Sequence, residues 1–313
     1  MTDQGPDQRA SKRYRGGKSW WRPTPRVAAA LVLSLCTAIW GASFVVSKNL
    51  VDRYDPLSIL ALRFLVATIA VWATRPRAVS SLPPASRWHA ALIGVLLGLA
   101  QIPHYFGVRE STASVAAFLI GTHVVMTPVV DRLLFGVRST WANVAGAVLA
   151  LFGLAIFAAG GTVSGLGLVL CLAAAVFYAL QISTVGAWVP ASNLWGFTTV
   201  TMAAITVVVS VPAAVVGVEI PSSAADWSGL LYLALVAGVG AVAMQAWAQR
   251  CIAATQAAVI LVMEPIWAAL VAITFTAEAL PVQLLFGGAV LLVANVLVVH
   301  ASRGNVADVI PAR

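Results

Sequence analysis

Charged residues are scarce in this sequence. They form 10% of the chain, whereas a soluble domain carries about 25%. Hydrophobic residues form 60%, and the mean hydropathy is +0.92. Every folded chain exposes part of its surface, so no water-soluble fold could hide this much apolar surface. We therefore expect the solvent to be lipid, and the 313 residues leave room for about ten spanning helices of roughly 20 residues each.

Cysteine and histidine are also few, which limits the chemistry. Cys36, Cys171 and Cys251 lie in or beside different apolar runs without paired spacing, so we expect no metal site and no disulfide framework. The four histidines are scattered, which argues against the clustered side chains of a membrane enzyme. No glycine-rich segment has the Lys and Ser/Thr spacing of a phosphate-binding loop, so we expect no cofactor and no ATP-driven transport.

Positive charge exceeds negative charge, with a net charge of +8. The basic residues gather in the tail 1–26 and in alternate loops, which is typical of membrane topology rather than of nucleic-acid binding. We expect no nucleic-acid partner. The tail 1–26 is predicted to be cytoplasmic and disordered, in reach of anionic headgroups, and 301–313 to be a cytoplasmic C-terminal tail. The apolar run from Val27 is too long for a signal-peptide core, which predicts a retained first helix.

Ten apolar runs predict an all-α polytopic membrane protein of ten transmembrane helices. The runs span roughly 28–47, 57–74, 90–108, 113–134, 142–160, 165–187, 196–217, 228–248, 253–275 and 282–300. Arginines mark the loops after the second, fourth and eighth runs, and the loops after the fifth, seventh and ninth runs have no Lys or Arg. This balance places both termini in the cytoplasm and predicts a multi-pass protein of the inner (cytoplasmic) membrane.

The two halves of the chain resemble each other. A shift of 250 − 109 = 141 positions places Arg109 on Arg250 and His123 on Glu264. In the front halves a shift of 138 places Asp55 on Asn193. We predict two five-helix repeats, 27–160 and 161–300. Because five is odd, the second repeat is inverted, an arrangement that recurs in secondary transporters with the site at the repeat interface.

Short motifs carry a more specific resemblance over roughly residues 28–300. They are Trp40-Gly41-Ala42-Ser43-Phe44, Asp55-Pro56, Leu62-Arg63-Phe64, Ala117-Phe118-Leu119, Pro128, Gln249-Arg250, Glu264-Pro265 and Gly287. The chain resembles the drug/metabolite transporter superfamily in its EamA-type ten-helix branch. The resemblance implies a secondary transporter and favours efflux. His123 departs from it, because many members have an aromatic or apolar residue there.

Glu264 is the leading candidate for function. A charged carboxylate at a helix centre costs about 2.5–3.5 kcal/mol, and protonation avoids much of that cost. Pro265 lacks an N–H and frees the Leu261 carbonyl of its helical partner. Glu264 is therefore a proton-coupling or substrate-contacting group, or else a protonated cap on a freed carbonyl in a neighbouring helix. His123, its counterpart in the other repeat, changes charge near physiological pH or is a packed, hydrogen-bonded residue.

Further candidates are polar or aromatic side chains within the apolar runs: His104, Lys48, Arg63, Trp40, Trp247 and Trp267. Lys48 and Arg63 lie near the outer ends of the first two runs, where they snorkel to headgroups, pair with nearby acids or form an anion-attracting vestibule. The three tryptophans are mid-run, so their N–H groups need partners inside the protein; they line a cavity or pack. Pro128 and Pro265 are the predicted helix breaks.

We expect the chain to be a secondary active transporter that moves small organic metabolites or drugs by alternating access, with protons as coupling ion. The expected partners are a small organic solute and membrane lipid. An uncoupled solute facilitator, and an integral membrane lipid-handling protein or enzyme, are the alternatives. Drug-like cations, amino acids and nucleotide precursors are all candidate solutes.

Overall fold

The computed structural model describes residues 25–111, 116, 119–158, 163–276 and 282–304. Within these ranges helices alternate with short loops, and the only extended pairing is an isolated antiparallel bridge between Ser111 and Val163. The predicted all-α class is confirmed. Most of the tail 1–26, the 277–281 loop and most of 301–313 lie outside the described residues.

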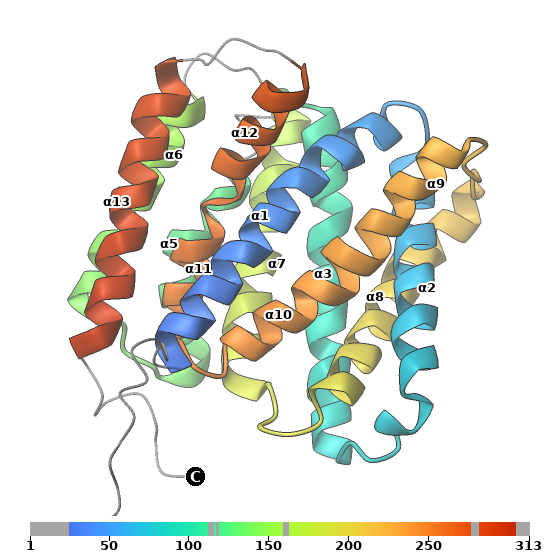
Figure 1. The fold of residues 1–313 in the computed structure, drawn as a ribbon, viewed down its shortest axis with the longest axis horizontal. Coiled ribbons are helices and arrows are strands. Elements are labelled where there is room, and N and C mark those ends of the chain that lie inside the picture. Colours follow the sequence, from blue (N-terminus) through green and yellow to red (C-terminus); the bar gives the residue numbers. More distant parts are fainter. Residues whose placement is uncertain (1–24, 112–115, 117–118, 159–162, 277–281, 305–313) are drawn as a thin grey trace, which may run out of the picture.

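In the described residues the N-terminal half has five α-helices and one short 3₁₀ turn. They are α1 (Pro25–Val51), α2 (Pro56–Thr74), η1 (Pro76–Ala78), α3 (Pro84–Arg109), α5 (His123–Phe135) and α6 (Trp141–Ala158). Figure 1 shows them as the blue, cyan and green ribbons; α2, α3 and α6 run roughly along one direction, and α1 crosses the bundle obliquely.

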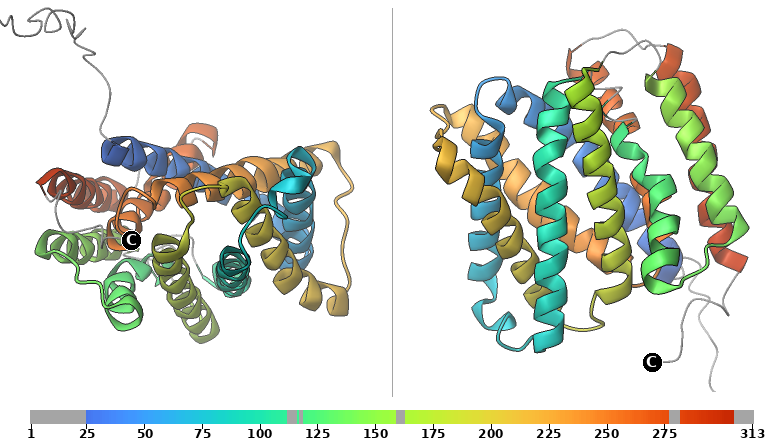
Figure 2. Two further views of the ribbon diagram at one scale, coloured as in Figure 1. Left: turned by 90° about the horizontal axis from the view of Figure 1, so that it is seen from below. Right: turned by 180° about the vertical axis from the view of Figure 1, so that it is seen from behind.

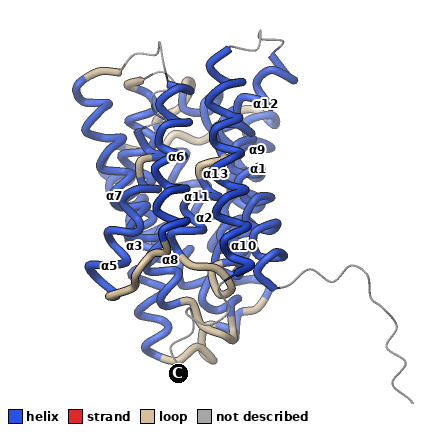
Figure 3. The backbone as a smooth tube through the Cα atoms, turned by 90° about the vertical axis from the view of Figure 1, so that its left-hand side faces the viewer, coloured by secondary structure: helices blue, strands red, loops and turns tan. Residues whose placement is uncertain are grey.

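The C-terminal half repeats this order with two rods divided into shorter pieces. Its elements are α7 (Gly165–Trp188), α8 (Leu194–Val216), α9 (Ala224–Leu231), the π-helical segment η2 (Tyr232–Gly240), α10 (Ala241–Ala248), α11 (Ala254–Leu261), α12 (Glu264–Thr276) and α13 (Val282–Gly304). Among the described residues, six helical rods are long and apolar enough to cross a membrane: α1, α2, α3, α7, α8 and the continuous rod α9–η2–α10. Figure 3 shows most loops gathered at the two ends of the bundle.

Turn residues begin several helices, as the sequence predicts. The Asp55 side chain accepts a hydrogen bond from the Leu57 N–H, and Pro56 occupies the first helical turn of α2. Asn193 adopts a left-handed conformation with φ of 53° and caps α8 by accepting from the Gly196 N–H. Such caps satisfy backbone N–H groups that a helix start leaves unpaired.

The packing of the helices has two-fold character. α3 packs against α7, and its counterpart in the second half, the rod α9–η2–α10, packs against α1. Likewise α5 packs on α7, while α11 and α12 pack on α1. The pairs α2–α8 and α6–α13 join equivalent helices and lie at opposite edges of the bundle (Figures 1 and 2). Helix contacts in the first half therefore have equivalents in the second half, as expected for two inverted five-helix units.

The two ends of the bundle differ in charge. We call the end where α1 begins the basic end; its arginines in the described residues are Arg26, Arg75, Arg77, Arg87, Arg132, Arg138, Arg250 and Arg303. The end where α1 finishes is the acidic end, with Asp52, Asp55, Glu110, Glu219 and Asp226 beside Lys48, Arg53 and Arg109. Between the ends the outer surface is apolar, with exposed side chains such as Val207 (63%) and Phe152 (63%). This distribution suits a bundle surrounded by lipid.

Two helices are interrupted at equivalent places. The turn at Val262–Met263 separates α11 from α12, directly before Glu264. In the first half the turn falls at Thr122, directly before His123, and the 141-residue shift places Thr122 on Met263. Pro128, expected to break its helix, instead lies inside α5, which continues to Phe135. A membrane helix tolerates an internal proline when neighbouring groups satisfy the backbone carbonyl that the proline frees. The interruption therefore lies at equivalent positions of the two repeats, and Pro128 does not determine it.

Candidate functional site

Glu264 stands at the first position of α12, immediately after the interruption. Its side chain is half-buried. Among the described residues, the carboxylate accepts no hydrogen bond and forms no ion pair; its neighbours in electrostatic range include the Tyr178 hydroxyl and the Cys36 thiol. A carboxylate without a protein partner in a membrane bundle is free to bind a proton or a cationic group. The cap on a neighbouring carbonyl, our alternative interpretation, has no corresponding hydrogen bond in this part of the chain.

Gly41 lets α1 approach this position closely. A Cβ atom on Gly41 would lie 2.8 Å from the Glu264 carbonyl oxygen and 2.5 Å from Cβ of Trp267. Both distances are shorter than real contacts of a Cβ atom, so only glycine fits without displacing α12. The Trp-Gly motif of the first helix and the Glu-Pro motif of the ninth therefore meet in space.

The three candidate tryptophans have different surroundings. The Trp40 N–H donates to the Ala237 carbonyl at 2.8 Å, inside the π-helical segment η2. Nε1 of Trp267 is buried without a hydrogen-bond partner among the described residues. Trp247 is half-buried and packs on the same core cluster as the other two. Trp40 thus joins α1 to η2, while Trp267 keeps an unused donor one turn beyond Glu264.

Tyr178 of α7 connects the candidates of both halves. Its hydroxyl lies 2.8 Å from Nδ1 of His104 on α3. Its ring centroid is 6.4 Å from that of His123 on α5, and its hydroxyl lies in electrostatic range of Glu264 on α12. Three protonatable side chains from three helices, His104, His123 and Glu264, therefore share one phenol as neighbour.

His123 presents one ring nitrogen to this group. Nδ1 lies 2.9 Å from the Ile120 carbonyl oxygen, and because a carbonyl only accepts, we assign the hydrogen to Nδ1. Nε2 is buried without a partner among the described residues. In the neutral imidazole Nε2 is an acceptor, and protonation turns it into a donor.

Arg63 and Lys48, which we considered together, lie in different environments. Arg63 is 5% exposed, and its Nη1 donates to the Tyr105 hydroxyl. Ser47 Oγ lies 3.0 Å from that same hydroxyl, and no carboxylate pairs with Arg63 among the described residues. Lys48 is exposed and its Nζ lies 2.5 Å from Asp52 Oδ1, one helical turn on. Lys48 thus forms the surface pair that was one of our alternatives, whereas Arg63 is a buried cation.

Sequence reasoning missed several of these residues. Tyr178 and Tyr105 resemble ordinary packing aromatics in apolar helices, although the repeat placed Tyr178 on Trp40 and so offered a signal. Gln181 and Gln245 exchange two hydrogen bonds, at 3.3 and 3.4 Å, between α7 and α10, and no sequence spacing indicates this pair. In the ranges that the structure describes, no three His, Cys, Asp or Glu side chains are grouped to hold a metal ion. The arrangement suits proton exchange and polar solute contact.

Comparisons with known proteins find similar transporters. A transporter of Archaeoglobus fulgidus, described as uncharacterized, is 28% identical over 278 residues, which cover 87% of this chain and 86% of that protein. The uncharacterized inner membrane transporter YedA of Escherichia coli K12 is 30% identical over 133 residues, 41% of this chain and 42% of its own. A crystal structure covering 89% of this chain superposes with a TM-score of 0.70 at 17% identity, which supports the fold alone.

The family itself follows from a match that covers both halves. The profile of the EamA-like transporter family matches residues 27–159 and again 165–300. Each match contains one of the two interrupted helices. The chain is therefore a member of the EamA-like transporter family, within the drug/metabolite transporters.

Proposed function

We propose that this protein is a proton-coupled secondary transporter that exports a small organic solute across the cytoplasmic membrane by alternating access. The observation that carries the proposal is Glu264: a half-buried carboxylate at a helix interruption, without a protein partner among the described residues. It lies in electrostatic range of the Tyr178 hydroxyl. Half-buried polar and aromatic side chains around it form the solute pathway.

The orientation follows from the charges at the two ends. Loops facing the cytoplasm carry an excess of Lys and Arg, and eight arginines of the described residues mark the basic end of the bundle. We place that end in the cytoplasm. Because α1 begins and α13 finishes at the basic end (Figure 1), both termini are cytoplasmic in this orientation.

Alternating access requires contacts between the repeats that break at one end at a time. At the basic end, Thr255 of α11 donates to Asp131 of α5 at 3.3 Å, and its hydroxyl lies 3.0 Å from Ser139. At the acidic end, Arg53 and Tyr54 contact the Asp226 carboxylate at 2.5 and 3.0 Å. We assign these two groups as the inner and outer gates, because each joins one repeat to the other.

Protonation of Glu264 supplies the coupling. Neutralising a carboxylate removes a cost of about 2.5–3.5 kcal/mol in the membrane interior, and this energy can bias which end of the bundle is open. A cationic group of the solute competes for the same carboxylate. Proton entry from one side and solute release to that side are thereby linked.

An uncoupled facilitator, the strongest alternative, needs no titrating group, and its transport would not respond to a pH gradient. Family membership favours a transporter over a membrane enzyme, and a lipid-handling protein would use the same scaffold.

A screen of a strain overexpressing the protein against metabolites and antimicrobials identifies the solute through raised tolerance. Glu264→Gln should abolish that tolerance at equal membrane expression. Glu110→Gln, a control at an exposed carboxylate of the acidic end, should keep it; tolerance retained by Glu264→Gln would contradict the coupling role.

A further inference from the structure

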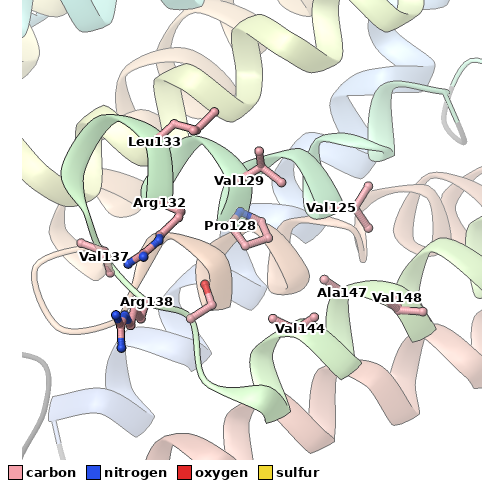
Figure 4. Close-up of a pocket in the computed structure, with 11 residues that line it drawn as sticks. Val125, Pro128, Val129, Arg132, Leu133, Val137, Arg138, Val144, Ala147 and Val148 are labelled. Carbon is pink, nitrogen blue, oxygen red and sulfur yellow. The ribbon is translucent and has the colours of Figure 1, made fainter.

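A second site lies on the outside of the bundle, between α5 and α6. The structure has a pocket of about 590 Å³ there, lined by residues 125–148 of these two helices and the loop between them. Figure 4 shows Val125, Val129, Val144 and Val148 along the pocket, with Arg132 and Arg138 together at one end. Asp131, Thr255 and Glu264 are not among its lining residues. Ser139, which contacts the Thr255 hydroxyl of the inner gate, does line the pocket, so the pocket adjoins the inner gate from the outside of the bundle and does not include Glu264.

The walls of the pocket are apolar and face outward. On the two helices, Val129 is 55% exposed, and Val148 is exposed as well. Exposed valines and leucines on a helix that lies in a membrane contact lipid chains. The long part of the groove therefore suits an acyl chain.

The end of the pocket carries uncompensated positive charge. Arg132 and Arg138 are exposed, and neither forms an ion pair among the described residues. The Arg132 guanidinium reaches only the Gly136 carbonyl, at 3.5 Å, and Arg138 has no hydrogen bond in this part of the chain. Two free guanidinium groups side by side favour a phosphate, because their planar forks donate in pairs to its oxygens.

The depth of the two arginines matches the headgroup layer. Trp141, the first residue of α6, is 83% exposed and follows Arg138 by three residues. Exposed tryptophans at helix ends lie at the level of the lipid headgroups. Gly136, with φ of 66°, ends α5 in a left-handed cap, so the chain turns back at this level and brings both arginines to the mouth of the groove.

We propose that this groove binds an anionic phospholipid of the leaflet at the basic end. The headgroup phosphate lies between Arg132 and Arg138, and one acyl chain follows the valines of α5 and α6. Basic pockets between membrane helices are suited to anionic headgroups. A second copy of this chain would bring two further arginines against the same pair, and the basic tail 1–26 would likewise be repelled, so charge complementarity favours the lipid over both.

The positions that correspond to the arginines in the second repeat are not basic. The 141-residue shift places Arg132 on Ile273 and Arg138 on Ala279. The repeat alone therefore does not require arginine at this place. The charge is specific to the end that faces the more anionic surface in our orientation.

The test is native mass spectrometry of the purified full-length protein with phosphatidylglycerol or phosphatidylcholine added to the detergent. The wild type should retain phosphatidylglycerol about tenfold more than phosphatidylcholine, as expected for two arginines at a headgroup. Arg132→Gln/Arg138→Gln should lose that preference. Arg75→Gln/Arg77→Gln is the matched control, because it removes the same charge from the same end away from the groove, and it should keep the preference.

A third variant separates the groove from surface charge in general. Val129→Trp fills the apolar part and keeps both arginines, so phosphatidylglycerol retention should fall although the charge is unchanged. Size-exclusion profiles and melting temperatures verify folding of each variant. Equal retention of the two lipids by the wild type, retained preference in Arg132→Gln/Arg138→Gln, or a protein dimer in place of the lipid adduct would overturn the proposal.

Discussion

Gly41 of α1 lies against the backbone of Glu264 in α12, so closely that a Cβ atom at Gly41 would stand 2.8 Å from the Glu264 carbonyl oxygen. The close approach brings the first helix of one repeat onto the interrupted helix of the other. Because α12 carries Glu264 and α1 packs directly against it, a small displacement of either helix should affect both stability and transport.

We predict that Gly41→Ala destabilises the protein by about 1–3 kcal/mol, the usual cost of overpacking a filled interior, and lowers transport. Gly288→Ala is the control, because a Cβ there would meet only Ile266 side-chain atoms at 3.7 Å or more. The melting temperature in detergent measures the difference. A Gly41→Ala protein as stable and active as Gly288→Ala would show that α12 yields freely at this point.

The Tyr178 hydroxyl should affect the pH dependence of transport more than the stability of the fold. Tyr178→Phe keeps the ring and removes the hydroxyl that lies 2.8 Å from His104 Nδ1, which should cost about 1 kcal/mol of stability and change the pH profile of transport. Tyr232→Phe loses one comparable hydrogen bond, to the Ile39 carbonyl at 2.9 Å, outside this group of side chains. If the two variants have the same pH profile, Tyr178 does not contribute to proton exchange.

Arg63 and Lys48 should respond differently to neutralisation. Arg63→Gln removes a buried cation that contacts Tyr105, and we expect loss of solute transport with near-normal expression. Lys48→Gln removes an exposed pair worth less than about 1 kcal/mol, so transport should stay near wild type. Uptake measured in membrane vesicles at equal protein content distinguishes the two, and equal activity would place Arg63 outside the solute pathway.

Topology is tested by reporter fusions in loops at the two ends. A reporter after Ser80, at the basic end, should report the cytoplasm, and one after Ser222, at the acidic end, should report the opposite side. The reason is the excess of arginine at the basic end. Signals from the same side at both positions would contradict the inverted arrangement.

The helices and their ends were largely predictable, because Asp55-Pro56 and Asn193 are local signals that act on their own helix. The interruption at Thr122 was not, because the sequence pointed to Pro128 and the adjacent Gly121 alone does not specify a break; packing between the repeats decides its place. The π-helical segment η2 likewise has no sequence signal that we recognised. Where a break depends on the partner helix, sequence periodicity does not locate it.

The residues of the candidate site were easier to predict from the sequence than the contacts between them. Glu264 and His123 follow from the cost of polar groups in apolar runs. Distance from a helix end suggested snorkelling for Arg63, but its burial depends on which face of α2 meets α3, and Tyr105 supplies that face. Tyr178 connects side chains from both repeats, so its place became visible only once the two repeats were assembled.

The most direct test of the account compares two transport modes in proteoliposomes that contain wild-type protein or Glu264→Gln. Exchange of labelled for unlabelled solute without a pH gradient requires the conformational cycle but no net proton movement, whereas accumulation driven by a pH gradient requires both. We predict that Glu264→Gln loses gradient-driven accumulation and also lowers exchange, because glutamine keeps the shape of the side chain but can neither bind the proton nor pair with a cationic group of the solute. Gradient-driven accumulation by Glu264→Gln at the wild-type level would contradict the central claim.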